Sequence, residues 1–225
     1  MRFIVREQGY EKPIASGQFR YEEDGVPTGA VESWRLTTAV SGYQILRVDL
    51  DARNASSGDS YIFHLVQQDD GTPERLGYRY WSTGLMIEGT VLFEGDQVSC
   101  RRNVNGRTLE EVIPVCDGFW FPSTIGLGIA SKLSNKADLT TATLNNQPNQ
   151  EETLALMEKS VSQTSDDDQS ELTLNGKTYT VTPTTFSWQS STRTVWLDIN
   201  KNWPLKMTRE DGLTAVETRY IWYGT

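Results

Sequence analysis

The sequence predicts a mainly β protein, built on one large, curved antiparallel sheet with one or two short helices as a lid. Three observations lead to this prediction. Stretches that alternate apolar and polar residues recur through most of the 225 residues. Short turns separate these stretches, and Asn105-Gly106 and Asn175-Gly176 are strong hairpin signals. One longer apolar run, Gly118–Leu133, breaks the alternation.

A first meander of strands is expected between about residues 15 and 115. It follows an entry arm, residues 1–14, in which Arg2–Arg6 forms a short strand. Turns that contain Gly, Asn or Asp bound each stretch. The expected strands are Gln18–Tyr21, Ala30–Val40, Gln44–Ala52, Tyr61–Val66, Arg75–Trp81, Leu85–Phe93, Asp96–Val104 and Arg107–Val115.

Alternation assigns the two faces of this meander. In the stretch Gln44–Ala52, Leu46, Val48 and Leu50 point inward. The charged residues between them, which point outward, are Arg47, Asp49 and Asp51. In the preceding strand the inner face carries Trp34, Leu36 and Val40. This pattern predicts a sheet with one face on the core and the other in water.

The hairpin at Asn105-Gly106 predicts a register. Centring it there pairs Val104 with Arg107, Cys100 with Glu111, Arg101 with Glu110, and Val98 with Ile113. The last two pairs join opposite charges and apolar side chains, as cross-strand neighbours do. Cys116 then lies about five positions, or roughly 16 Å, from the partner of Cys100, too far for a disulfide. We therefore expect two reduced cysteines.

The run Gly118–Leu133 is expected to lie against the concave face of the sheet. Apolar residues recur every four positions in its second half, one stripe of a helix. These residues are Phe121, Ile125, Ile129 and Leu133. Gly126 and Gly128 each cost about 1 kcal/mol relative to alanine in a helix. They suit a lid that bends or packs closely on the sheet.

The last third of the chain returns to strands. Before it, residues 134–152 are polar with a short strand at Asp138–Leu144, Thr153–Val161 fits a strand or a helix, and residues 162–170 read as a solvated loop. The expected strands are Glu171–Leu174, Lys177–Thr182, Thr185–Trp188, Arg193–Ile199, Pro204–Arg209 and Ala215–Tyr223. We predict one domain, 1–225, in which residues 118–170 connect the meanders 15–115 and 171–225.

Composition limits the classes of partner. Thirty acidic and twenty-one basic residues give a net charge of −9, which disfavours binding to nucleic acid. No stretch approaches the roughly 18 to 20 apolar residues of an integral membrane segment. The N-terminus lacks the apolar core of a secretory signal. We expect a cytoplasmic protein, or a periplasmic or secreted one if a signal has been removed.

No catalytic, metal or cofactor site is expected from the pattern of polar residues. The single histidine, His64, lies in an apolar strand and is expected to be structural. The acidic run Asp166-Asp167-Asp168 lacks the alternating ligands, glycine and distal glutamate of a calcium loop. The Gly126-Leu127-Gly128 sequence lacks the lysine of a phosphate-binding loop.

Aromatic residues are the most informative candidates for a binding site. Seven tryptophans and nine tyrosines spread along the expected sheet. They fill the core of a curved sheet, or they line a cavity under the lid. The candidate ligand-binding residues are Trp34, Tyr78, Tyr80, Phe119, Trp120, Phe121, Ile125, Ile129, Trp196 and Trp222.

Two regions resemble a known family. One is Gly17–Trp81, with Phe19, Tyr21, Trp34-Arg35-Leu36 and the long strand to Ala52. The other is the C-terminal hairpin with Trp196-Leu197-Asp198, Trp203-Pro204-Leu205-Lys206-Met207 and Asp211-Gly212, and Pro114–Ser123 adds a weaker likeness. Together they resemble the LolA-like superfamily of bacterial proteins, which includes lipoprotein carriers and a glycolipid-binding group. The resemblance implies a half-barrel or spiral β-roll, closed by helical or loop lids over an apolar cavity.

These observations predict a protein without a cofactor that binds an apolar or amphipathic small molecule, such as a lipid or glycolipid, between sheet and lid. The chain departs from the lipoprotein carriers, because it has no export signal or lipobox cysteine. One alternative is a cofactor-independent enzyme that uses the same cavity, with His64 or Arg79 beside a carboxylate. Another is an interaction module with a filled core. The contents of the space beneath the lid separate the three.

Overall fold

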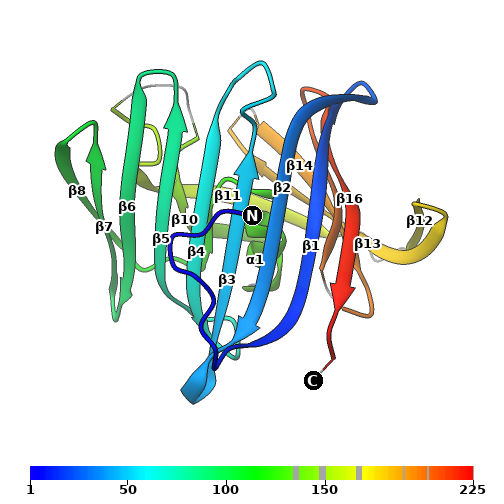
Figure 1. Cartoon of the computed structure of the whole chain (residues 1–225), viewed down its shortest axis with the longest axis horizontal. Helices are drawn as coiled ribbons and strands as arrows, with labels where there is room; N and C mark the ends of the chain where they lie inside the picture. The colour runs from blue at the N-terminus through cyan, green and yellow to red at the C-terminus, as the bar shows by residue number, and fades with distance from the viewer. Residues whose placement is uncertain (134–136, 147–150, 166–168, 190, 202, 225) are drawn as a thin grey trace.

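All described strands belong to one large, curved sheet that does not close on itself (Figure 1). The computed structural model describes residues 1–133, 137–146, 151–165, 169–189, 191–201 and 203–224. The strands are β1 (Lys12–Glu23), β2 (Val26–Thr38), β3 (Tyr43–Asp51), β4 (Ser60–Gln68), β5 (Pro73–Ser82), β6 (Leu85–Glu94), β7 (Gln97–Val104), β8 (Arg107–Pro114), β9 (Gly118–Trp120), β10 (Asp138–Leu144), β11 (Leu156–Ser165), β12 (Ser170–Leu174), β13 (Lys177–Trp188), β14 (Ser191–Asp198), β15 (Pro204–Arg209) and β16 (Leu213–Trp222).

The order of the strands confirms the mainly β prediction and its curved antiparallel sheet. Strands β8 to β1 follow one another across the sheet, β16 continues from β1, and β15, β14, β13, β11, β10 and β9 complete it. Strand β12 pairs with β13 outside this path. All pairs are antiparallel except β9 with β10. The first and last strands, β1 and β16, therefore pair in the interior of the sheet.

The register predicted for the hairpin β7–β8 is confirmed. Val104 pairs with Arg107, Arg101 with Glu110, Cys100 with Glu111, and Val98 with Ile113. Cys100 and Cys116 are free thiols. The turn residue Asn105 has a φ of 48°, the left-handed conformation that this two-residue turn requires.

The concave face carries the inward-pointing residues of the long strands. Leu46 and Val48 on β3 are buried there, as the alternation predicts, and so are Trp34 and Leu36 on β2. Val40 does not join them. It lies in the short 3₁₀ turn Val40–Gly42 and is exposed, because β2 ends at Thr38.

The convex face is not open to water around β3, contrary to the prediction. Residues 1–11 cross it, in front of β3 to β5 in Figure 1, and Arg47 and Asp49 are buried beneath them. The predicted strand at Arg2–Arg6 is also wrong. The arm bonds to side chains rather than to a strand: Asp49 accepts hydrogen bonds from Arg2, and Arg47 donates to the carbonyl of Val5 over 3.1 Å.

The run Gly118–Leu133 divides into two elements. Gly118–Trp120 is β9, which joins the edge of the sheet beside β10. The helix α1 (Thr124–Leu133) follows and lies within the curve of the sheet, in contact with β14 and β15 (Figure 1). Phe121, Ile125 and Ile129 are buried, as the four-residue stripe predicts. The helix therefore plugs the concave face, and Phe121 packs against Phe63 with ring centroids 4.7 Å apart.

Three smaller predictions change. The ambiguous stretch Thr153–Val161 contains most of β11, which continues to Ser165 where a loop was expected. The separate strand Thr185–Trp188 is the end of β13. Asp166, Asp167 and Asp168 lie outside the described residues.

The glycine in the second turn of α1 allows the helix to pack closely on β15, since a Cβ at Gly128 would lie 2.6 Å from the ring of Pro204.

A substitution at Gly89 tests the packing of the concave face. A Cβ at this position would lie 2.2 Å from the ring of Tyr78, which is fully buried and donates a hydrogen bond to the carbonyl of Leu154. We expect Gly89→Ala to lower the free energy of unfolding by about 1–3 kcal/mol, the usual range for overpacking. Urea denaturation measures this loss of unfolding free energy. Gly77→Ala on the neighbouring strand is the control, because its Cβ would meet only Ile4 at 3.8 Å. Equal losses in the two variants would contradict the prediction.

Candidate functional site

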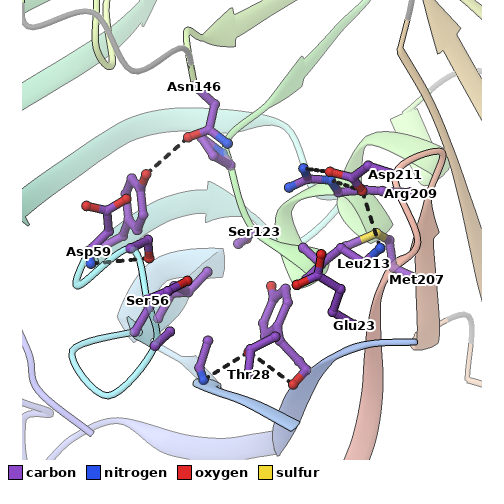
Figure 2. A pocket seen from close by; sticks show the side chains of 18 of the residues that line it. Glu23, Thr28, Ser56, Asp59, Ser123, Asn146, Met207, Arg209, Asp211 and Leu213 are labelled. Carbon is purple, nitrogen blue, oxygen red and sulfur yellow. Dashed lines mark hydrogen bonds and ion pairs between the residues drawn. The ribbon is translucent and has the colours of Figure 1, made fainter. Parts of the chain in front are cut away.

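A cavity of about 400 Å³ opens beside the N-terminal end of α1 (Figure 2). We call it the helix-end cavity. Residues of the strands β1 to β5 and β14 to β16 line it, together with residues of the turns between them. The residues that line it are Tyr21, Glu23, Thr28, Ala30, Leu50, Ala52, Ala55, Ser56, Ser57, Asp59, Tyr61, Tyr80, Pro122, Ser123, Asn146, Thr153, Arg193, Met207, Arg209, Asp211 and Leu213.

Two tyrosines and a carboxylate form one side of the cavity. Tyr80 donates a hydrogen bond to Asp59 over 3.1 Å, and Tyr61 donates to Asn146 over the same distance. The two tyrosine rings lie 4.8 Å apart. Burial raises the pKa of Asp59, although the hydrogen bond from Tyr80 opposes this shift. This side therefore offers flat aromatic surface with its hydroxyl groups already bonded.

The end of α1 is closed by a carboxylate from β2. Glu32 accepts hydrogen bonds from the backbone N–H groups of Thr124 and Ile125 over 2.8 and 2.9 Å. Tyr21 donates a third hydrogen bond to Glu32 over 2.5 Å. Burial raises the pKa of Glu32, against the opposing effect of these bonds.

A local cap completes the end of the helix. The hydroxyl of Ser123 accepts from the N–H of Gly126 over 2.8 Å, and its carbonyl accepts from Leu127 over 3.1 Å. With the two N–H groups bound by Glu32, the first turn of α1 has no N–H left to offer a ligand. The helix end therefore shapes the cavity without supplying an anion site.

Arg193 forms the opposite side of the cavity. It lies on β14, half-buried, with its guanidinium carbon 4.8 Å from the ring centroid of Trp120 and 5.1 Å from that of Trp188. Among the described residues, none forms a hydrogen bond or ion pair with this guanidinium. Its neighbour Arg209 is paired with Asp211.

The lowered pKa of Arg193 indicates that no bonded anion stabilises its positive charge. Burial and the positive charge of Arg209 lower it to about 10. Tyr21, Glu210 and Asp211 oppose the shift without reaching hydrogen-bond distance. A cation with a lowered pKa beside a cavity is typical of a functional site.

The predicted ligand-binding residues do not gather at one place. Tyr80 lines the helix-end cavity. Trp120 does not line it, but its ring lies beside Arg193, which does. Most of the others pack in the buried core. Trp34 stacks on Trp203, Tyr78 bonds to Leu154, Phe121 precedes α1, and Ile125 and Ile129 are buried residues of α1. Trp196 and Trp222 are less buried and lie under the ammonium groups of Lys206 and Lys201.

A second space of similar size, the edge cavity, lies near β9. Its walls include Phe93, Val98, Val115, Cys116 and Phe119. Of the predicted residues, Phe119 alone lines it. It lacks the unpaired guanidinium of the helix-end cavity, and no arginine or lysine lines it among the described residues.

The residues proposed for the enzyme alternative lie on the convex face. His64 pairs with Arg47 across β3 and β4, and burial lowers its pKa to about 4. Arg79 forms an ion pair with Glu88 over 3.0 Å, with both side chains exposed. Neither residue lines the helix-end cavity.

Sequence reasoning missed Arg193, Glu32 and Asp59. A signal for the first two is present in the alternation. Arg193 is in phase with the inward-pointing Val195 and Leu197, and Glu32 is in phase with Trp34. A charged residue in phase with buried ones needs a partner or a function. Asp59 ends a turn-rich loop and carries no such signal.

A buried carboxyl group outside the cavity gives a pH-dependent prediction. Burial raises the pKa of Glu217 to about 7, while the charge of Lys177 opposes and that of Asp198 adds to the shift. The unfolded chain releases this proton near 4.5, so the free energy of unfolding falls as the pH rises from about 4.5 to about 7. Above pH 7 we expect Glu217→Gln to be more stable than the parent protein by up to about 3 kcal/mol. Urea denaturation at pH 5 and pH 8 measures this, and an unchanged difference between the two pH values would contradict it.

Two further observations concern the described part of the chain. No three His, Cys, Asp or Glu side chains gather there as a metal site. No helix there has the length and apolar character to span a bilayer. Searches against protein-family models and against curated proteins find no match to this chain.

Proposed function

We propose that this chain is a binding protein that holds one small amphipathic molecule in the helix-end cavity. The observation that carries the proposal is this cavity, whose wall holds the Arg193 guanidinium without a bonded partner among the described residues. Its volume of about 400 Å³ lies within the roughly 300–1,000 Å³ of small-molecule sites. The function agrees with what the resemblance to LolA-like half-barrels implies.

The lining of the cavity supports an amphipathic rather than a purely apolar ligand. Leu50, Met207 and Leu213 offer aliphatic surface, and Tyr61 and Tyr80 offer aromatic surface. Charged and hydroxyl-bearing residues interrupt this surface on both sides. A site of this kind holds the apolar part of a ligand by area and orients it with a few polar groups.

The position of the plug supports ligand entry from the rim. Glu32 fastens the end of α1 to β2 through buried hydrogen bonds, so binding does not need the helix to move. The rim carries the exposed residues Glu23 and Ser56. Entry there requires only the displacement of water.

Filling the cavity tests the proposal. We expect the parent protein to take up about one equivalent of the uncharged probe Nile red, read by fluorescence and native mass spectrometry. Leu50→Trp should abolish this uptake, because the larger ring occupies the cavity. Tyr43→Trp is the matched control on the same strand, away from the cavity, and should bind like the parent. No uptake by the parent, or equal uptake by Leu50→Trp, would contradict the proposal.

A further inference from the structure

Arg193 is a cation that the protein holds in place without neutralising it. Two indole rings lie beside its guanidinium, with ring centroids at 4.8 and 5.1 Å, and those rings pack against each other at 5.4 Å. Taking a charge out of water is unfavourable unless the charge is paired and hydrogen-bonded. The five N–H donors of this guanidinium have no acceptor among the described residues. A ligand that supplies acceptors and one negative charge therefore completes the site.

The carboxylates around Arg193 favour a ligand with one negative charge over a dianion. Arg209, which pairs with Arg193 in the β14–β15 register, forms an ion pair with Asp211. Glu210 accepts the backbone N–H of Thr192 over 3.0 Å, so two carboxylates stand near the guanidinium. Lys159 is a second cation near the guanidinium, and burial and the charge of Arg193 lower its pKa. A dianion would still face both carboxylates, whereas a single negative charge needs only Arg193. The opposite side of the cavity holds Asp59, which repels a second anionic end.

We infer that the helix-end cavity selects a monoanionic amphipath, whose carboxylate bonds to Arg193 and whose apolar chain lies against Leu50, Met207 and Leu213. This inference rests on the proposed function. A carboxylate matches the planar fork of a guanidinium with two parallel hydrogen bonds. Figure 2 shows Met207 and Leu213 close to the Arg209–Asp211 pair, which places apolar wall beside the charged side of the cavity.

Calorimetry with four probes of one chain length tests the inference. The probes are octanoate, 1-octanol, octylammonium and octyl phosphate, at pH 8. We expect the parent protein to bind octanoate about 10- to 100-fold more tightly than 1-octanol, the range of a hydrogen-bonded charge pair. Octylammonium should bind most weakly. Octyl phosphate, a dianion at this pH, should bind less tightly than octanoate.

Variants of Arg193 locate the effect. Arg193→Gln should lower octanoate affinity about 10- to 100-fold and leave 1-octanol affinity unchanged. Arg193→Lys keeps the positive charge but not the planar fork of the guanidinium. Its octanoate affinity should therefore lie between those of the parent protein and Arg193→Gln. Arg35→Gln is the matched control, since Arg35 also stacks on a ring, that of Tyr223, but lies outside the cavity. Circular dichroism checks that each variant is folded.

The outcomes separate the inference from the proposed function. If 1-octanol binds the parent as tightly as octanoate, or if Arg193→Gln and Arg193→Lys keep full octanoate affinity, the inference is wrong while the proposed function stands. Tighter binding of octyl phosphate than of octanoate overturns the assignment of a single charge. If neither octanoate nor 1-octanol binds, both are wrong.

Discussion

Replacing Glu32 with alanine should lower the free energy of unfolding by about 3–5 kcal/mol, since each buried group left without a partner costs about 1–3 kcal/mol. The carboxylate is completely buried and accepts the N–H groups of Thr124 and Ile125 and the hydroxyl of Tyr21. The two backbone donors would lose their acceptor, whereas the Tyr21 hydroxyl keeps the hydroxyl of Thr124 at 2.9 Å. The side chain would also leave a hole between β2 and α1.

Hydrogen exchange and urea denaturation measure this effect. Amides in residues 124–129 should exchange faster in Glu32→Ala than in the parent, while those of β7 should not. Glu32→Gln is the control, because the amide oxygen of glutamine still accepts hydrogen bonds. This variant should lose about half as much stability as Glu32→Ala. An unchanged denaturation midpoint in Glu32→Ala would show that the plug does not depend on this contact.

Replacing Arg47 with methionine should lower the free energy of unfolding by about 3–5 kcal/mol, the usual loss when one partner of a buried ion pair is removed. The two nitrogens of its fork donate to the two oxygens of Glu11 over 2.7 and 2.8 Å. The Arg47 side chain is only 2% exposed and that of Glu11 is fully buried. Burial alone would raise the pKa of Glu11, but the bonds from Arg47 and Thr37 hold it at about 2.

A double substitution separates the lost pair from a packing defect. The variant Arg47→Met with Glu11→Leu leaves no buried charge, and apolar replacement of a whole buried pair is often neutral or stabilising. It should recover most of the loss seen in Arg47→Met alone. If the loss of unfolding free energy in the double variant equals the sum of the losses in Arg47→Met and Glu11→Leu alone, the arm is not held by this ion pair.

The sheet was predictable because its signals are local. The alternation of Leu46, Val48 and Leu50 is a property of one strand, and Asn105-Gly106 sets a register within one hairpin. The spacing of Ile125 and Ile129 likewise identified the helix from local residues, although α1 begins at Thr124 and leaves Phe121 outside it. Each of these features depends on residues close together in the chain.

The cavity was not predictable because its residues come together only in the folded sheet. Arg193 on β14 and Trp120 on β9 are distant in the chain, and only the fold places the guanidinium 4.8 Å from the indole ring. The same reason explains the convex face. Arg47 alternates like a solvent-facing residue, and only the path of residues 1–11 over β3 buries it against Glu11.

Contacts between octanoate and the protein test the central claim most directly. In an isotope-edited NMR experiment with ¹³C-labelled octanoate, we expect nuclear Overhauser effects from the chain to the methyl groups of Leu50, Met207 and Leu213. These three residues line the helix-end cavity. Effects to Val98 and Val115, which line the edge cavity, or no effects to any methyl group, would contradict the account.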